Sequence, residues 1–88
     1  MNKYKMKSDF YAIQFNNNID ELKSLFGDKI SRYRNKYEND VFGVESCTVD
    51  TSDGFISAET NDYIVQDDRN ELSVYTEKSF NHYFEKVD

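Results

Sequence analysis

Eight carboxylate side chains in the second half of the chain fall in or beside predicted turns and strand ends. Side chains at such positions stay exposed, and a rigid sheet beneath them holds them in place. Carboxylates held in this way can imitate a row of phosphates and occupy a channel of lysines and arginines in a nucleic-acid-handling enzyme. Acidity can also serve solubility alone, so that simpler interpretation stays open. The candidate partner-binding residues are Glu45, Asp50, Asp53, Glu59, Asp62, Asp67, Asp68 and Glu71.

The net charge of −6 conceals a division along the sequence. Residues 1–36 carry eight basic and four acidic side chains, a balance of +4, whereas residues 37–88 carry three basic and thirteen acidic ones, a balance of −10. An acidic total argues against a general nucleic-acid binder, because affinity for phosphates depends on cationic contacts. It suits a protein that offers a negative face to a partner with a basic surface.

Basic and aromatic residues alternate in the segment Arg32-Tyr33-Arg34-Asn35-Lys36-Tyr37. Such a mixture can stack on bases or grip phosphates. Weak nucleic-acid binding through Arg32, Arg34 and Lys36 is therefore an alternative. Because the surroundings are acidic, we favour a solvated face or a dock for the protein's own carboxylates.

Residue types that support catalysis are sparse in this chain. A nucleophilic enzyme needs a nucleophile, a base and an orienting group within hydrogen-bond reach. The single histidine, His82, lies off the apolar stripe of a predicted helix, where a solvated side chain is the simplest interpretation. The single cysteine, Cys47, stands in a strand-like run and is expected to be a small buried hydrophobe rather than a reactive thiol. We therefore expect no enzymatic activity.

Two acidic segments bear a faint likeness to cation sites. Asp50 with Asp53-Gly54 lacks the third-position Asp, the alternating ligands and the terminal Glu of a calcium loop. Asp67-Asp68 beside Glu71 can hold a hard cation only weakly, and an acidic solvated turn is the better interpretation. One cysteine excludes a Cys-only zinc site and an internal disulfide, and three scattered glycines form no phosphate loop. The sequence thus predicts no metal and no cofactor.

The C-terminal part of the chain predicts a hairpin followed by a helix. Asn61–Val65 and Glu71–Thr76 are β-favouring runs on either side of an Asp- and Asn-rich turn, which is typical of a hairpin. A hairpin and an amphipathic helix side by side can cover each other. Four apolar side chains then recur at i, i+3, i+4 and i+7 on one helical face, namely Phe80, Tyr83, Phe84 and Val87.

The N-terminal part predicts a strand and then a helix. Phe10–Phe15 is apolar on both faces, so we expect it inside a sheet, whereas Met1–Lys7 is expected to be frayed or added at an edge. Asn18 with Glu21 fits a variant of the capping box, and Gly27 stands where a helix takes its left-handed terminus. The expected helix face is Ile19, Leu22, Leu25 and Phe26.

The middle of the chain fits two local structures, a short helix or an extended segment, followed by two strands. Residues 29–40 place Ile30, Tyr33 and Tyr37 at helical spacing, which favours a second short helix slightly over an extended segment. Val41–Val49 is strand-like, and a change of phase predicts a bulge near Gly43 or Glu45. Thr51-Ser52-Asp53-Gly54 then predicts a turn, with Phe55–Ala58 as the returning strand.

These elements predict an α+β fold in one domain over residues 1–88. We expect a small antiparallel sheet of four to five strands, with an N-terminal-half helix and a C-terminal helix packed on it. The longest apolar run, Phe10–Ile13, is far below the roughly 18 residues of a membrane span. Met1–Lys7 leads into no apolar segment of signal-peptide length, so an intracellular protein is expected.

The same stretches resemble a small phage-borne family. Its first motif reads roughly EAIQWTGxNxEEIKEFLG, to which Tyr11–Asn16, Asn18, Glu21-Leu22 and Phe26-Gly27 are similar. Its second motif reads roughly PGDYIIKGxxGEFYPCKPDIFEKTYE, and the similar residues are Asn61–Val65, Glu71-Leu72, Phe80 and Phe84. This chain has Thr60-Asn61 in place of the family's Pro-Gly, Tyr75 in place of its Cys and Glu77 in place of its second Pro. The resemblance implies a phage or prophage accessory protein and specifies no reaction.

The leading hypothesis is therefore a non-enzymatic phage accessory protein acting in the host cytoplasm. It would bind a host protein with a basic surface, a defence or nucleic-acid-handling protein, and inhibit it through the acidic residues, in the manner of an anti-CRISPR or anti-restriction protein. The charge division motivates an alternative from another class, a self-associating phage assembly or structural module, in which the basic part of one copy meets the acidic part of another.

Overall fold

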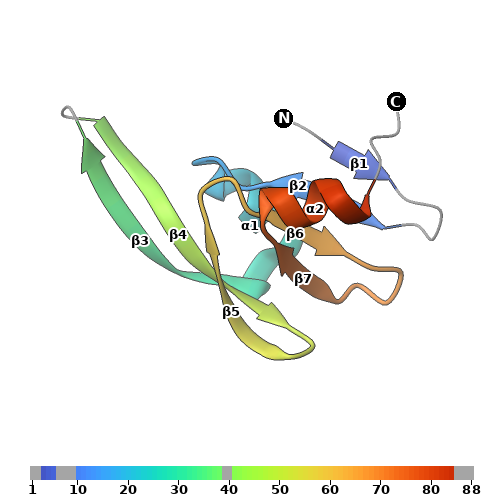
Figure 1. Cartoon of the computed structure of the whole chain (residues 1–88). Coiled ribbons are helices and arrows are strands. Elements are labelled where there is room, and N and C mark those ends of the chain that lie inside the picture. Colours follow the sequence, from blue (N-terminus) through green and yellow to red (C-terminus); the bar gives the residue numbers. More distant parts are fainter. Residues whose placement is uncertain (1–2, 6–9, 39–40, 85–88) are drawn as a thin grey trace.

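The computed structural model of the chain describes residues 3–5, 10–38 and 41–84. Seven strands, two α-helices and one short 3-10 helix follow one another in this part of the chain (Figure 1). Their order is β1 (Lys3–Lys5), β2 (Tyr11–Gln14), α1 (Ile19–Phe26), η1 (Gly27–Lys29), β3 (Ile30–Glu38), β4 (Val41–Thr51), β5 (Gly54–Glu59), β6 (Tyr63–Gln66), β7 (Leu72–Tyr75) and α2 (Glu77–Tyr83).

The strands form two antiparallel sheets. One sheet has the order β1-β2-β6-β7 and the other the order β3-β4-β5. The predicted α+β class is confirmed, but the expectation of one sheet with four to five strands is wrong. The chain changes sheet after β5 because it turns sharply there: the Asp62 carboxylate accepts the Glu59 N–H at 2.9 Å, and Asn61 is left-handed with φ 79°. This turn lets β6 pair with β2 instead of β5.

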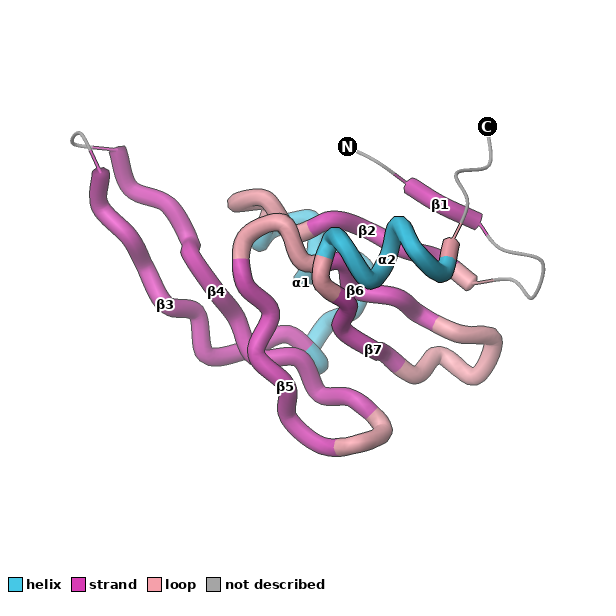
Figure 2. The backbone as a smooth tube through the Cα atoms, in the orientation of Figure 1, coloured by secondary structure: helices cyan, strands magenta, loops and turns pink. Residues whose placement is uncertain are grey.

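Both faces of the four-stranded sheet are covered, as Figure 2 shows with α2 in front of it and α1 behind. Ile13 and its cross-strand neighbour Ile64 point to the α1 side, whereas Ala12 and its neighbour Val65 point to the α2 side. Residues alternate between faces along a strand, so β2 needs apolar side chains at successive positions. The prediction that this strand lies inside a sheet is confirmed, and β1 is added at its edge as expected.

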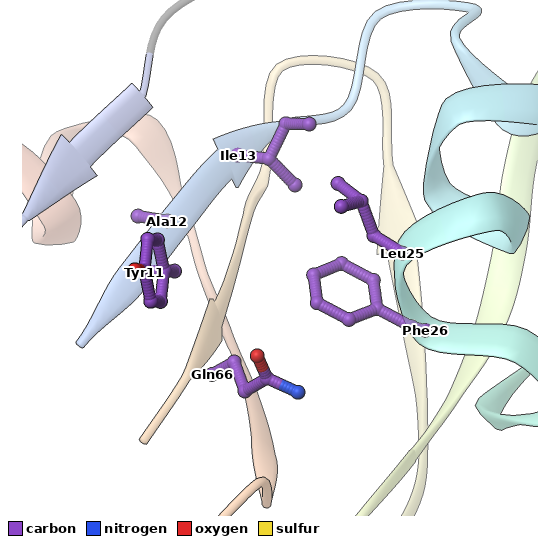
Figure 3. Close-up of a pocket in the computed structure, with 6 residues that line it drawn as sticks. All are labelled: Tyr11, Ala12, Ile13, Leu25, Phe26 and Gln66. Atoms are coloured by element: carbon purple, nitrogen blue, oxygen red, sulfur yellow. The ribbon is translucent and has the colours of Figure 1, made fainter. Parts of the chain in front are cut away.

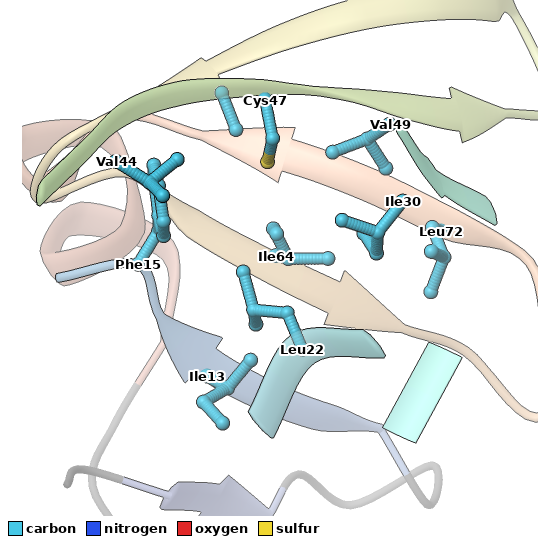
Figure 4. Packing of buried hydrophobic residues seen from close by; sticks show 10 residues of the cluster. Ile13, Phe15, Leu22, Ile30, Val44, Cys47, Val49, Ile64 and Leu72 are labelled. Carbon is cyan, nitrogen blue, oxygen red and sulfur yellow. The ribbon is translucent and has the colours of Figure 1, made fainter. Parts of the chain in front are cut away.

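The larger core lies between the two sheets and beneath α1. Figure 4 shows side chains from both sheets and from Leu22 of α1 pointing into one space. Of the expected helix face, Leu22 is fully buried, Ile19 and Phe26 pack half-buried against the border of this core, and Leu25 is 52 % exposed. The buried members are Ile13, Phe15, Leu22, Ile30, Val44, Cys47, Val49, Ala58, Ile64 and Leu72.

A smaller aromatic core lies between the sheet and α2. The Phe80 ring is fully buried and stacks on the Tyr63 ring, with centroids 3.8 Å apart and planes 6° apart. The Phe84 ring centroid lies 4.7 Å from the Phe80 ring centroid. Tyr83, in contrast, is 67 % exposed. Thr76 caps the N-terminus of the helix, because its hydroxyl accepts the Ser79 N–H at 3.1 Å. Val87 of the predicted apolar face lies outside the described residues.

The boundaries of α1 follow the predicted residues, with one difference in the cap. Asn18 precedes the helix, but its side-chain amide donates to Glu21 at 2.9 Å and to the Gln14 carbonyl at 3.1 Å instead of accepting a helix N–H. Gly27 ends the helix with φ 58°, a conformation that costs glycine least. The positive φ expected at this terminus is confirmed, but ψ of −131° places Gly27 outside the left-handed helical region.

The expected helix over residues 29–40 is wrong, and the extended alternative is confirmed. After one 3-10 turn the chain enters β3, which pairs with β4 as far as Glu38 opposite Val41. Arg32 is left-handed, with φ 53°, and the register between β3 and β4 shifts at this point. The helical spacing of the aromatic residues therefore does not correspond to a helix. Residues 39 and 40 lie outside the described residues.

The β3–β4 ribbon projects away from the rest of the molecule (Figure 1). Its base is fixed by Asn17, left-handed with φ 57°, whose side-chain oxygen accepts the Val44 N–H at 2.8 Å. The register passes from Arg34 opposite Ser46 to Asn35 opposite Val44, so Glu45 is an extra residue. The predicted bulge at this point is confirmed. The predicted hairpin between β4 and β5 is confirmed too, with Thr51 opposite Gly54.

Candidate protein-binding surface

The structure divides the eight candidate carboxylates into three groups. Glu45 and Glu59 come together around Arg34. The Arg34 Nε lies 3.3 Å from Glu45 and its terminal nitrogen lies 3.5 Å from Glu59. The three residues belong to adjacent strands, and the bulge at Glu45 brings its side chain within reach of the arginine. Arg34 therefore offsets part of the negative charge at this end of the molecule.

Asp62 and Asp67 are held by backbone amides of their own turns. Asp62 accepts the Glu59 N–H at 2.9 Å, and one oxygen of Asp67 accepts the N–H groups of Arg69 and Glu71 at 2.9 Å each. Aspartate commonly stabilises turns in this way. Both side chains thus have a structural role, and a substitution there would change the turn as well as the charge.

The remaining carboxylates, with Asp67, surround the ends of two hairpins. Asp50 and Glu71 line one hollow of about 170 Å³ together with Lys29, Thr51, Ser52 and Leu72, so the β4–β5 turn and the β6–β7 turn are neighbours. Both turns lie at the lower right in Figure 2. We call this region the two-turn edge. It consists of Asp50, Asp53, Asp67, Asp68 and Glu71.

The two-turn edge keeps a net negative charge, because its five carboxylates outnumber the two cations beside them, Lys29 and Arg69, and neither cation forms an ion pair with them. Within the described residues, ion pairs are formed by Arg34 alone, at the other end of β4. Lys29 lies beside Asp50 and Glu71, but its amine donates to the Asn70 carbonyl. Asp50, Asp53, Asp68 and Glu71 are exposed. Their carboxylates therefore produce a local negative field that extends into solvent.

The basic and aromatic segment is exposed at Arg32, Tyr33 and Arg34, and it also makes contacts with its own chain. Arg34 contacts two carboxylates, and the Arg32 guanidinium lies over the Phe55 ring at 5.8 Å. Lys23 lies over the Tyr33 ring at 5.2 Å, and the hydrogen bond to this tyrosine raises the pKa of the lysine. The Lys36 side chain lies outside the described residues. Arg34 therefore binds carboxylates of its own chain, in line with one of the two interpretations favoured from the sequence.

In the described part of the chain, the side chains outside this surface that could bind a metal or take part in catalysis are not brought together. Within residues 3–5, 10–38 and 41–84, no three His, Cys, Asp or Glu side chains are grouped so that they could hold a metal ion. His82 is exposed on α2 and contacts its neighbour Tyr83 edge-on. None of the helices in the described residues is long and apolar enough to cross a membrane.

Cys47 is a buried hydrophobe, as predicted, with an exposed fraction of 1 %. Burial raises the pKa of its thiol from 9.0 to about 11. The protonated thiol is favoured in the folded state, so this group contributes stability below pH 9.0 that is lost as the pH rises toward about 11.

We expect Cys47 to resist alkylation and disulfide exchange in the native protein. Near pH 8 the higher pKa lowers the thiolate fraction about 100-fold, and burial slows access further. The measurement is the rate of reaction with a chromogenic disulfide reagent in buffer and in concentrated urea. Equal rates in the two conditions would show that the thiol is accessible in the folded state.

One feature that sequence analysis missed is an apolar groove beside α1, with a volume of about 200 Å³ (Figure 3). Its lining residues are Tyr11, Ala12, Ile13, Leu25, Phe26 and Gln66. Leu25 belongs to the predicted helix face and was expected in the core, but it stays half exposed next to the end of α1, which comes one residue later. The short length of the helix, eight residues, was the signal in the sequence that part of its apolar face would stay exposed.

Comparison of the chain with protein-family models, with curated proteins and with solved structures finds no match.

Proposed function

We propose that this chain is a non-enzymatic phage accessory protein that binds a host protein with a basic surface and inhibits it. The target would be a defence or nucleic-acid-handling protein of the host cytoplasm, so the activity would be of the anti-CRISPR or anti-restriction type. The observation that carries the proposal is the two-turn edge, where five carboxylates surround neighbouring turns and no described cation forms an ion pair with them. The motif resemblance supports the phage origin.

The mechanism follows from the rigidity and the charge of this edge. Each of the two turns closes a hairpin, and hydrogen bonds to Asp67 and Thr51 hold their backbones. Carboxylates carried on a held backbone need less reorganisation on binding than carboxylates on a mobile loop, so less ordering entropy is lost in the complex. Their field attracts a channel of lysines and arginines and raises the association rate. A partner so covered cannot admit a nucleic acid at the same place.

Two alternatives receive less support. Self-association through the charge division requires free cations in residues 1–36, yet Arg32, Arg34 and Lys29 already contact groups of their own chain. Direct nucleic-acid binding meets the same objection at Arg32 and Arg34. Sedimentation at low salt would reveal self-association, and a gel-shift titration would reveal nucleic-acid binding.

The proposal is tested by neutralising exposed carboxylates of the two-turn edge. The partner is first isolated by affinity capture from host lysate and identified by mass spectrometry. We expect a basic, nucleic-acid-handling protein in a stoichiometric complex. The triple variant Asp50→Asn/Asp53→Asn/Asp68→Asn should weaken the complex roughly tenfold or more, since each charge pair at an interface contributes on the order of 1 kcal/mol. Asp67 is kept because it stabilises its turn.

A matched control neutralises three carboxylates outside this edge, Asp20→Asn/Glu21→Gln/Glu77→Gln, at the starts of the two helices. Calorimetric titration should give nearly unchanged affinity for this control. Affinity of the native chain should fall as salt rises from about 0.05 M to about 0.3 M, because ions screen exposed charges. A partner without a basic surface, or equal weakening by both triple variants, would contradict the proposal.

A further inference from the structure

The apolar groove and the two-turn edge are adjacent along the chain at the end of β6. Gln66, the last residue of β6, lines the groove and pairs with Tyr11 of β2. The next residues along the chain are Asp67 and Asp68, which begin the β6–β7 turn. An apolar hollow and two carboxylates are therefore joined through one residue of the sheet.

The groove is open on one side and apolar on its walls. Figure 3 shows Leu25 and Phe26 of α1 facing Ile13 and Tyr11 of β2, with the Gln66 amide at one end. Leu25 and Tyr11 are 52 % and 54 % exposed, so these walls keep apolar surface in contact with water. Covering such surface is favourable because apolar side chains are removed from water.

The size of the groove limits what it can accept. Its volume of about 200 Å³ exceeds the engineered cavity of about 150 Å³ that binds benzene in another protein. A phenyl ring or a branched aliphatic side chain fits this space. The Gln66 amide can donate to and accept from a peptide backbone passing its end of the groove.

We propose that the groove takes one large apolar side chain from a partner protein segment in which a lysine or arginine stands beside that residue. The apolar side chain packs against Ile13, Leu25 and Phe26, and the neighbouring cation lies at Asp68. This inference rests on the proposed function and deepens it, because it adds an apolar anchor to a surface otherwise defined by charge. Charge complementarity favours a basic protein segment over a neutral apolar compound.

The experiment uses the full chain and three synthetic peptides that differ at the anchor and at its flanks. They are the acetylated, amidated heptapeptides Gly-Ser-Lys-Phe-Lys-Ser-Gly, Gly-Ser-Lys-Ala-Lys-Ser-Gly and Gly-Ser-Glu-Phe-Glu-Ser-Gly. Methyl NMR spectra follow Ile13 and Leu25, and amide spectra follow Asp68. The Lys-Phe-Lys peptide should give saturable shifts at all three residues. We expect the other two peptides to bind at least about fivefold more weakly, since each lacks roughly 1 kcal/mol of interaction.

Two variants locate the binding site. Leu25→Lys places a charge in the groove at a half-exposed position, and it should weaken Lys-Phe-Lys binding at least about fivefold. The matched control Tyr83→Lys changes an exposed aromatic residue on α2, which covers the opposite face of the sheet, and it should leave the affinity unchanged.

The outcomes separate this inference from the proposed function. Equal affinity for the Lys-Phe-Lys and Lys-Ala-Lys peptides, or an absence of shifts at Ile13 and Leu25, would overturn the groove as an anchor site. Equal affinity for the Lys-Phe-Lys and Glu-Phe-Glu peptides would overturn the role of the neighbouring cation. If the peptides fail while a captured basic partner still depends on Asp50, Asp53 and Asp68, the inference fails and the proposed function stands.

Discussion

The Phe80→Ala variant is expected to lose about 3–5 kcal/mol of unfolding free energy, the range measured for large aromatic residues in protein cores. Phe80 is fully buried, stacks on Tyr63 and contacts Phe84, so its removal leaves a cavity between α2 and the sheet. Because it is the one fully buried side chain of α2 within the described residues, the helix would lose its main attachment. Urea denaturation followed by circular dichroism measures the change.

Tyr83→Ala on the same helix provides the control for Phe80. Tyr83 is 67 % exposed, so its substitution should change the unfolding free energy by no more than about 0.5 kcal/mol. Similar losses of unfolding free energy in the two variants would mean that contacts along the whole of α2 stabilise its packing. The aromatic stack would then contribute no more than the other contacts.

Phe15→Ala should produce a loss of similar size, about 3–5 kcal/mol, in the larger core. Phe15 is fully buried and points toward Val44 of the other sheet in Figure 4. Its backbone is fixed independently, since its N–H donates to the Asp62 carbonyl at 2.7 Å and its carbonyl accepts the Asn61 N–H at 2.8 Å. The position cannot move to close the cavity. Thermal and urea unfolding together would measure the loss.

Phe15→Leu separates the volume of this side chain from its location. Leucine retains most of the apolar volume, so we expect a loss of about 1 kcal/mol. A leucine variant as unstable as the alanine variant would indicate that ring shape, and not filled volume, joins the two sheets.

Much of the fold was predictable because its signals are local. The hairpin of β6 and β7 lies on either side of a turn whose Asn70 is left-handed, with φ 64°, and Asn61 before β6 has φ 79°. Asparagine tolerates this conformation better than most residues. Gly27 ends α1 for the same kind of reason. Turn residues and caps act over three or four positions, so a sequence displays them directly.

The second sheet could not be predicted from local signals. Ile30 and Tyr33 have helical spacing, but β3 is extended because β4 pairs with it and because Arg32 is left-handed. Arginine carries no preference for that conformation. Pairing between strands and the sharp turn at Asn61 together decide which strands share a sheet. These are tertiary effects that propensity does not contain.

The candidate surface was predictable only in part, for the same reason. Exposure of the turn carboxylates follows from their position between strands, and the structure places Asp50, Asp53, Asp68 and Glu71 at the surface. The pairing of Arg34 with Glu45 and Glu59 depends on a bulge and on the register of three strands. The groove at Leu25 likewise depends on where a helix rests on a sheet, which no sequence pattern specifies.

The irregular register of β3 has a consequence for aggregation. β3 is an edge strand of its sheet, and a long, flat edge is a template on which other chains can add as strands. The shifts between Ser31 and Asn35, with the left-handed Arg32 between them, interrupt this edge near its middle. An incoming strand therefore finds no uninterrupted ladder along the nine residues of β3. The irregular register should therefore make the β3 edge a poorer template for edge-to-edge pairing than a regular strand.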